Sequence, residues 1–324
     1  MCVVIWLALI LYLAYRLYQH LCPSPNINPH GKYVLISGCD TGFGHALAIE
    51  LDKQGFNVFA AVYNPNNKLS VTSELSARAT VFDPDITLEN DIDAAYDIVK
   101  DKTDTLHALV NNAGIGQGGL IDWGSLESIR NIMNVNFFGH VAMAKKFLPL
   151  LLVRRDSRVI TICSASGYLA KPSMPAYCSS KFAFESFSDC LRREMFAWGL
   201  HVCIIEPSFM RTPIIDGHER SLSNLWSKLP SDVKDRWGED FFDSYVQKVA
   251  TNPFIQYAEN PNKVVRALKH AVTNTVPKIR YRPGWQNLIF FSLSMIPTWL
   301  ADVIIVTVTN PAVLPAGVKT QIKS

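Results

Sequence analysis

Short apolar segments alternate with longer helical segments through the middle of this chain, and this alternation constrains the fold more than any other feature. Apolar strands separated by helices are typical of βαβ units, in which crossover helices join parallel strands. The pattern therefore predicts an α/β fold, a doubly wound parallel sheet of the Rossmann type with helices on both faces. The expected strands are 33–37, 57–62, 80–82, 108–110, 158–163 and 201–205, and the expected helices are 46–53, 88–100, 129–152 and 175–198.

The amino-terminal segment is apolar and carries no charged residue before Arg16. Extended to Leu21, with Arg16 reaching toward the headgroups, a helix of this length covers about one bilayer core. A cleaved signal peptide usually has a basic start and a small-residue cleavage site, whereas this segment has no basic start and is followed by Pro23 and Pro25. We therefore predict that residues 1–22 form an uncleaved membrane anchor. A cleaved signal peptide and a soluble helix are the alternatives.

Composition divides the rest of the chain into four parts. Residues 23–30 are rich in Pro and Asn and predict a linker. Residues 31–215 contain the alternating segments and predict the core of the protein. Residues 216–285 are irregular, helical and rich in aromatic side chains, as expected for a cap over a binding site. Residues 286–324 predict a hydrophobic carboxy-terminal segment and tail.

The carboxy-terminal apolar stretch, residues 288–308, is interrupted by Pro297 and Asp302. An Asp at the centre of a bilayer costs about 2.5–3.5 kcal/mol. We therefore expect two short hydrophobic helices that lie on a membrane or dip into it, rather than a second span. A helix packed against the core is the alternative.

Charge and composition exclude several kinds of partner. The net charge is +3 and the chain has no run of five or more basic residues, which argues against nucleic acid. The seven cysteines include no C-x-x-C pair, and the eight histidines form no cluster with ligand spacing. We expect neither a metal site nor a disulfide framework.

The run S-G-C-D-T-G-F-G at 37–44 directly follows an expected strand and precedes a helix. Glycines let a backbone approach a pyrophosphate, and a helix N-terminus supplies N–H groups and a positive dipole end. The spacing differs from the commoner G-x-G-x-x-G fingerprint. The run predicts a dinucleotide site, with tight packing of strand on helix as the alternative. The residues of this site are Gly38, Asp40, Gly42, Phe43 and Gly44.

Tyr177 and Lys181 lie four residues apart in an expected helix and so share one of its faces. A free phenol titrates near ~10, so a base at neutral pH needs a shift of roughly 2–3 units. A Lys ammonium and a nicotinamide cation favour the phenolate. Ser164, at the end of the preceding strand, is placed to hold a substrate oxygen. A Y-x-x-x-K pair is common by chance, so its value depends on the other motifs.

Asn112, Ala113 and Gly114 follow the expected strand at 108–110. Polar groups and a small residue at this end of a parallel strand lie where open α/β sheets bind ligands. An ordinary turn is the alternative.

Together these motifs resemble, in order and spacing, the short-chain dehydrogenase/reductase family over about residues 30–215. The resemblance implies an oxidoreductase whose core, residues 31–215, binds a dinucleotide and carries the catalytic groups. It places Gly38, Gly42 and Gly44 at the pyrophosphate and Asp85 and Asn112 at the adenosine half.

The resemblance also implies four catalytic roles. Asn136 is the structural and proton-relay residue, and Ser164 orients the substrate. Tyr177 is the acid or base, and Lys181 lowers the Tyr177 pKa and binds the nicotinamide ribose.

The sequence departs from the family pattern at two places. Ser37 stands where the family has Thr, and Ser208 stands where the family has Gly after Pro207. Tyr177, Pro207 and Thr212 are further expected cofactor contacts, and Thr212 would meet the carboxamide side of the nicotinamide. Neither departure affects the Ser, Tyr and Lys set.

Longer runs resemble the microsomal retinol dehydrogenase and hydroxysteroid dehydrogenase branch of the family. These runs are G-C-D-T-G-F-G at 38–44, S-D-C-L-R-R-E at 188–194, E-P-S-F-M-R-T at 206–212 and I-P-T-W-L-A-D-V at 296–303. The resemblance implies a lipophilic alcohol or ketone as substrate, a retinol or a hydroxysteroid. D-β-hydroxybutyrate dehydrogenases share some of these motifs and are the alternative enzyme. A non-catalytic membrane scaffold with the same fold is the alternative from another class.

The residues after the second strand, A-V-Y-N at 61–64, decide the cofactor expectation. An acidic residue there binds the ribose of NAD and a basic one the phosphate of NADP, and neither is present. Without a basic clamp we expect NAD, with NADP as the alternative if Lys68 reaches a phosphate.

Location and assembly are expected from the ends of the chain and from the resemblance. Arg16 and His20 lie near the carboxyl end of the anchor and His30 and Lys32 beyond it, which favours a cytosolic domain. The resemblance to the microsomal branch implies the endoplasmic reticulum membrane. The resemblance also implies a possible homodimer through the helices around 129–152 and 176–198.

Overall fold

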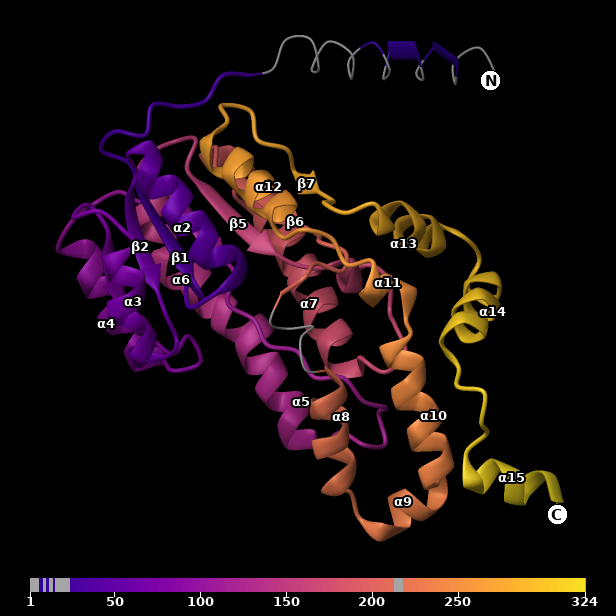
Figure 1. Cartoon of the computed structure of the whole chain (residues 1–324). Helices are drawn as coiled ribbons and strands as arrows, with labels where there is room; N and C mark the ends of the chain where they lie inside the picture. The colour runs from indigo at the N-terminus through magenta and orange to yellow at the C-terminus, as the bar shows by residue number, and fades with distance from the viewer. Residues whose placement is uncertain (1–5, 8–9, 12–13, 15–23, 213–217, 324) are drawn as a thin grey trace.

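The computed structural model describes residues 6–7, 10–11, 14, 24–212 and 218–323 (Figure 1). Its centre is a parallel sheet with the strand order β3-β2-β1-β4-β5-β6-β7. The chain builds the sheet outward from β1 in one direction and from β4 in the other, so the strand order reverses between β1 and β4. This is the doubly wound α/β fold that the sequence predicts.

The first six strands begin at the residues that the apolar runs predict and end within one residue of the expected positions. The strands are β1 (Tyr33–Ser37), β2 (Asn57–Ala61), β3 (Thr80–Phe82), β4 (Ala108–Asn111), β5 (Arg158–Ile162), β6 (His201–Ile205) and β7 (Arg280–Tyr281).

Helices cover both faces of the sheet. One face packs against α2 (Gly42–Gln54) and α12 (Asn262–Thr273), and the other against α4 (Glu89–Lys100), α6 (His140–Leu151) and α7 (Pro175–Glu194). The remaining helices are η1 (Pro65–Asn67), α3 (Lys68–Ser73), α5 (Leu126–Met133), η2 (Asn134–Gly139), η3 (Ala165–Gly167), η4 (Phe196–Trp198), α8 (His218–Ser227), α9 (Ser231–Trp237), α10 (Glu239–Ala250), α11 (Pro253–Gln256), α13 (Gln286–Met295), α14 (Thr298–Thr309) and α15 (Ala316–Lys323).

The expected cap, residues 216–285, includes two elements that pack with the sheet, α12 and β7. α12 packs on α2, β5 and β6, and β7 pairs with β6 at the sheet edge, so both belong to the core. In this part of the described chain, helices α8 to α10 stand apart from the sheet (Figure 1), whereas Phe254 of α11 packs on Phe209 and Phe290. The amphipathic pattern of a helix is the same on a cap as on a sheet. The strand β7 has only 2 residues, so its sequence cannot show the alternation of apolar and polar residues by which a strand is predicted.

Aromatic rings hold the cap helices together. Trp123, from the loop before α5, is 2% exposed and lies 5.3 Å from Trp226 and 5.9 Å from Trp237 between ring centroids. These tryptophans therefore pack the cap.

The two ends of the chain differ in what the structure describes. The expected anchor, residues 1–22, lies outside the described residues except for five isolated positions. The expected linker is attached to the core, because Ile27 N donates to Thr273 O at 2.7 Å and Thr275 N donates to Pro25 O at 3.0 Å.

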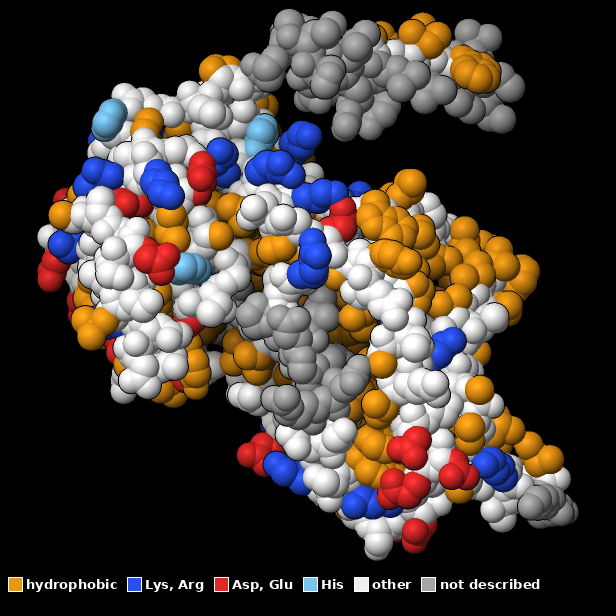
Figure 2. Space-filling model, in the orientation of Figure 1, with side chains coloured by type: hydrophobic (Ala, Val, Ile, Leu, Met, Phe, Trp, Pro, Cys, Tyr) orange, Lys and Arg blue, Asp and Glu red, His pale blue; other side chains and the backbone are white. Residues whose placement is uncertain are grey.

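The carboxy-terminal segment forms two short helices, α13 and α14, that meet at Pro297, as the sequence predicts. Within the described part of the chain, none of the helices combines the length and apolar character that a membrane span requires. Figure 2 shows apolar side chains gathered over this segment. The exposed ones include Leu288, Met295, Trp299 and Val303.

Candidate active site

A cavity of about 580 Å³ lies along the carboxyl ends of the central strands, where the strand order reverses. Open α/β sheets bind ligands at such reversals. The wall includes every residue assigned to cofactor binding or catalysis from the sequence except Gly44 and Asn136, and both of these contact residues of the wall. The predicted lining residues are Gly38, Asp40, Gly42, Phe43, Asp85, Asn112, Ala113, Gly114, Ser164, Tyr177, Lys181, Pro207 and Thr212.

The glycine loop between β1 and α2 closes on the loop that follows β4. A Cβ at Gly44 would lie 2.4 Å from Asn112 Nδ2 and 2.5 Å from Gly38 O. A Cβ at Gly38 would lie 2.8 Å from Ala113 Cα. These two glycines therefore allow the close packing that shapes the cradle.

The start of α2 is open toward an anion. Gly42 has a left-handed φ of +67°, and nothing lies within 4 Å of the position that its Cβ would take. The side chain of the N-cap residue Thr41 makes no capping hydrogen bond. The N–H groups of the first turn remain for a ligand, so this loop fits a pyrophosphate.

We expect Gly44→Ala to weaken NADH binding about tenfold or more, because the added methyl group would force Asn112 and Gly38 apart. The measurement is a fluorescence titration with NADH. Gly124→Ala is the matched control, since its Cβ would meet Ser128 Oγ at 3.9 Å and nothing closer. Equal affinity of the two variants would contradict the cradle.

Asp40 occupies a position that the sequence pattern does not reveal. Its Oδ2 accepts from Tyr63 N at 2.7 Å, and its Oδ1 accepts from Asn64 N at 2.8 Å. These residues follow β2, where an acidic side chain meets the ribose of NAD. The glycine loop thus supplies the carboxylate that the second strand lacks. Lys68 instead pairs with Asp83 at 2.7 Å and is not a lining residue.

Asn112 and Asp85 lie in the wall but use their side chains within the protein. Asn112 Nδ2 donates to Ser37 O at 2.9 Å and to Gly38 O at 3.0 Å. Asp85 Oδ1 accepts from the N and Oγ1 atoms of Thr87 at 2.8 and 2.7 Å. Asn112 therefore shapes the glycine loop, and the contact of both residues with adenosine stays a prediction.

Asn136 lies on the π-helical turn η2, which interrupts the single helix expected over 129–152. Such turns often occur at functional sites. The buried Asn136 amide accepts from Ile115 N and donates to Ile115 O, both at 2.9 Å, and donates to Ser180 Oγ at 3.1 Å. Asn136 thus ties the loop after β4 to α7. Its part in a proton relay stays a prediction.

Ser164, Tyr177 and Lys181 line one cavity from two elements. Ser164 lies just after β5, and its hydroxyl acts to lower the pKa of the Tyr177 phenol. Tyr177 and Lys181 lie on α7, with Lys181 Nζ 5.8 Å from the centroid of the Tyr177 ring. Lys181 is 3% exposed and donates to Ile162 O at 2.8 Å.

Burial acts on both titratable groups of this set. It raises the pKa of the Tyr177 phenol, and the hydrogen bond with Ser164 partly offsets the rise. Burial also lowers the pKa of the Lys181 ammonium. Both shifts favour the neutral forms. The expected lowering of the Tyr177 pKa by Lys181 therefore stays a prediction.

Pro207 and Thr212 lie on the loop after β6, at the other side of the cavity. Pro207 O accepts from Ala165 N at 2.9 Å, which fixes the loop beside Ser164. Thr212 Oγ1 donates to Met210 O at 3.3 Å.

Comparison with known families agrees with this geometry. The sequence model of the short chain dehydrogenases matches residues 32–221. The chain belongs to the short-chain dehydrogenase/reductase family. It is an oxidoreductase of that family.

Two crystal structures share its fold. A short-chain dehydrogenase from Streptomyces avermitilis is 24% identical with a TM-score of 0.66, covering 85% of this chain and 94% of that one. A short chain dehydrogenase/reductase from Burkholderia phymatum in complex with NAD is 18% identical with a TM-score of 0.68, covering 89% and 98%.

Curated relatives place the chain in the retinol and hydroxysteroid branch of the family. Human short-chain dehydrogenase/reductase family 9C member 7 is 36% identical over 85% of this chain and 88% of its own length. Human retinol dehydrogenase 5 is 36% identical over 84% and 87%. Bovine 17-beta-hydroxysteroid dehydrogenase type 6 is 34% identical over 85% and 87%.

Several lining residues of this short-chain dehydrogenase/reductase escape sequence analysis. Among the described lining residues, Lys171 and Lys181 are the cations, and Met174, Phe209 and Met210 add apolar surface. A single Lys in a loop belongs to no pattern, so the sequence gives no signal for Lys171.

Proposed function

We propose that this protein transfers hydride between a nicotinamide cofactor and a lipophilic alcohol or ketone, a retinol or a hydroxysteroid. The observation that carries the proposal is that Ser164, Tyr177 and Lys181 line the same cavity as the glycine cradle. The relatives named retinol dehydrogenase and 17-beta-hydroxysteroid dehydrogenase support the substrate classes. The apolar lining of the cavity suits a substrate that partitions into lipid.

Each residue of the set has one task in this reaction. A nicotinamide held by the cradle supplies the hydride acceptor for oxidation. The Tyr177 oxygen takes the proton of the substrate hydroxyl, or returns a proton to the ketone oxygen in the reverse direction. Ser164 holds the same substrate oxygen, and Lys181 adds a positive charge close to the phenol. Asn136 keeps Ile115 and α7 in place.

The test is turnover by the full-length protein in detergent, with NAD or NADP and a panel of alcohols. The panel contains retinols, hydroxysteroids, 3-hydroxybutyrate and simple alcohols. Oxidation of a lipophilic alcohol supports the proposal, and preference for 3-hydroxybutyrate would favour the hydroxybutyrate dehydrogenase alternative. Absence of NADH binding would favour the non-catalytic scaffold.

We further propose NAD as the cofactor, with NADP as the alternative. The Asp40 carboxylate lies at the end of β2, and among the described lining residues the cations Lys171 and Lys181 belong to the catalytic side. The ribose 2′-phosphate of NADP would lie beside the negative charge of Asp40, with no basic side chain among the described lining residues on that side to neutralise it.

We expect Asp40→Asn to lower the preference for NAD over NADP about tenfold, because a charge repulsion of about 1–4 kcal/mol is removed. The measurement is the ratio of kcat/KM for the two cofactors. Asn keeps an acceptor oxygen for Tyr63 N or Asn64 N, which limits the structural cost. Asp104→Asn, at an exposed ion pair outside the cavity, is the control. Equal use of NAD and NADP by the unaltered protein would refute the assignment.

We also propose attachment to the endoplasmic reticulum membrane with the domain in the cytosol. The exposed apolar side chains of α13 and α14 support contact with a membrane surface. Protection of the domain from protease added to intact microsomes would contradict the cytosolic orientation. A homodimer through the helices around 129–152 and 176–198 is proposed from the family resemblance, and its test is the mass in detergent.

A further inference from the structure

Lys171 is a second cation in the cavity, and the acid–base set does not use it. It lies on the loop between η3 and α7 and is half-buried. Its Nζ lies 4.6 Å from the ring centroid of Phe209 and 4.3 Å from that of Phe290. Among the described residues, no carboxylate and no hydrogen-bond acceptor contacts this ammonium.

The two rings beside Lys171 are held by buried amide side chains. Phe209 N donates to Gln286 Oε1 at 3.1 Å, and Gln286 is fully buried. Asn287, at the start of α13, donates to Glu206 O at 2.9 Å, which fixes the helix that carries Phe290. The surroundings of the Lys171 ammonium are therefore built into the fold.

Among the described lining residues, no carboxylate lies on the side of Lys171. The carboxylates of this set are Asp40 and Asp85, which belong to the cofactor side. Burial lowers the pKa of Lys171 to about 8, with Cys178 acting in the opposite direction, so the ammonium is still largely protonated at neutral pH. A partly desolvated cation on aromatic faces gains from an anionic ligand, because the ligand supplies the missing charge.

We infer that Lys171 is a specificity residue that binds a carboxylate of the substrate, so that the preferred substrate is a lipophilic hydroxy acid or the matching keto acid. This inference rests on the proposed function. Tyr177 and Ser164 then act on the alcohol carbon, while the apolar side chains contact the body of the molecule. The carboxylate gives the substrate a fixed orientation beside the apolar side chains of Met174, Phe209 and Met210.

The test compares an acid with its methyl ester, which keeps the alcohol and removes the charge. The probe is a 3-hydroxysteroid with a carboxylate side chain, assayed with the full-length protein in detergent and NAD. The unaltered protein is expected to show a kcat/KM about 10–100-fold higher for the acid than for the ester. The difference should appear in KM, because Lys171 acts on binding and not on the proton transfer.

Variants of Lys171 separate its charge from its packing. Lys171→Met is expected to bring the ratio of acid to ester close to one, and Lys171→Arg to keep most of it. Lys146→Met is the control, because Lys146 pairs with Asp93 on the surface at 2.6 Å and is not a lining residue. An acid-to-ester ratio near one in the unaltered protein, or a ratio unchanged in Lys171→Met, would overturn the inference.

Other outcomes keep the inference and the proposed function apart. Turnover of neutral retinols or hydroxysteroids without turnover of the acid overturns the role of Lys171 and leaves the oxidoreductase proposal standing. Absence of turnover of every alcohol, despite NADH binding, removes the proposed function and the inference with it.

Discussion

Tyr177→Phe is expected to lower kcat for alcohol oxidation by about 10²–10⁴-fold and to leave the Kd for NADH nearly unchanged. The substitution removes only the phenolic oxygen, which is the group placed to exchange a proton with the substrate. The ring remains in the cavity wall, so the cradle at the other side keeps its shape. The measurements are steady-state kinetics with the best alcohol of the panel and a fluorescence titration with NADH.

The dependence on pH gives this prediction a second readout. Burial raises the pKa of Tyr177, so the neutral phenol dominates at neutral pH. Oxidation needs the phenolate as proton acceptor, and its rate is expected to rise with pH. Ketone reduction needs the phenol as donor, and its rate is expected to fall as the phenol ionises. The small residual activity of Tyr177→Phe should lack both trends.

Tyr96→Phe is the control, because Tyr96 lies on α4, outside the cavity wall, where its ring faces Lys146. Retention of a tenth or more of kcat in Tyr177→Phe would mean that another group carries the proton transfer.

Much of the fold follows from local sequence, because each core strand is an apolar run between recognisable turns. β1 and the glycine loop show this most clearly. A buried strand, a turn that needs glycine and a helix start occur together within residues 33–44, and the structure places them as expected. The meeting of Ser164, Tyr177 and Lys181 at one cavity was predictable for a similar reason, since Tyr177 and Lys181 share one helix and Ser164 lies just after a central strand.

The remaining features depend on contacts between distant parts of the chain. Asp40 reaches the end of β2 only because the glycine loop turns back over the sheet. The Lys171 ammonium lies over the ring of Phe290, a residue of the carboxy-terminal segment, and no local sequence pattern connects that segment with the cavity. β7 forms a strand because it pairs with β6, and its own short sequence does not predict one.

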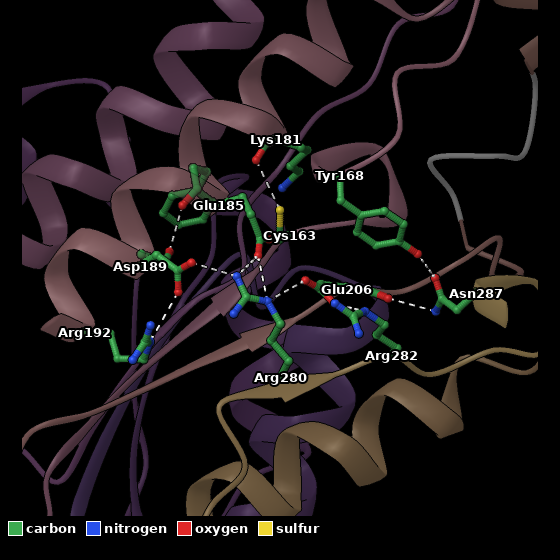
Figure 3. A network of polar contacts seen from close by, with 12 residues as sticks. Cys163, Tyr168, Lys181, Glu185, Asp189, Arg192, Glu206, Arg280, Arg282 and Asn287 are labelled. Atoms are coloured by element: carbon green, nitrogen blue, oxygen red, sulfur yellow. Dashed lines mark hydrogen bonds and ion pairs between the residues drawn. The ribbon is translucent and has the colours of Figure 1, made fainter. Parts of the chain in front are cut away.

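Arg280, on β7, is surrounded by carboxylates from two other parts of the chain (Figure 3). Its Nη2 lies 2.7 Å from Glu185 Oε1 and 2.9 Å from Asp189 Oδ2, both on α7, and its Nε lies 3.1 Å from Glu206 Oε1. Glu185 lies one helical turn after Lys181. The network thus joins α7, which carries Tyr177 and Lys181, to the last strand of the sheet.

Arg280→Met is expected to lower the free energy of unfolding by about 3–5 kcal/mol, with a fall in Tm of roughly 5–15 °C. The Glu206 side chain is 1% exposed and the Glu185 side chain 12% exposed, so the substitution leaves buried carboxylates without this partner. Arg193→Met is the control, since Arg193 is 64% exposed and lies 3.7 Å from Asp189. The loss there should be under about 1 kcal/mol.

The deficit of Arg280→Met should grow as the pH rises above about 8, the folded pKa of Glu206 in the unaltered protein, because only there do the two folded states bind different numbers of protons. Burial raises the pKa of Glu206 above its ordinary value of 4.5, as does Glu185, while Arg282 and Arg280 lower it. A carboxyl whose folded pKa is raised contributes stability at low pH and loses it as the pH rises through that pKa. Removal of Arg280 raises the folded pKa further, so ionisation of Glu206 opposes folding more strongly. Adding Glu206→Gln should recover more of the loss at pH 9 than at pH 6. A deficit independent of pH would show instead that Arg280 acts through packing alone.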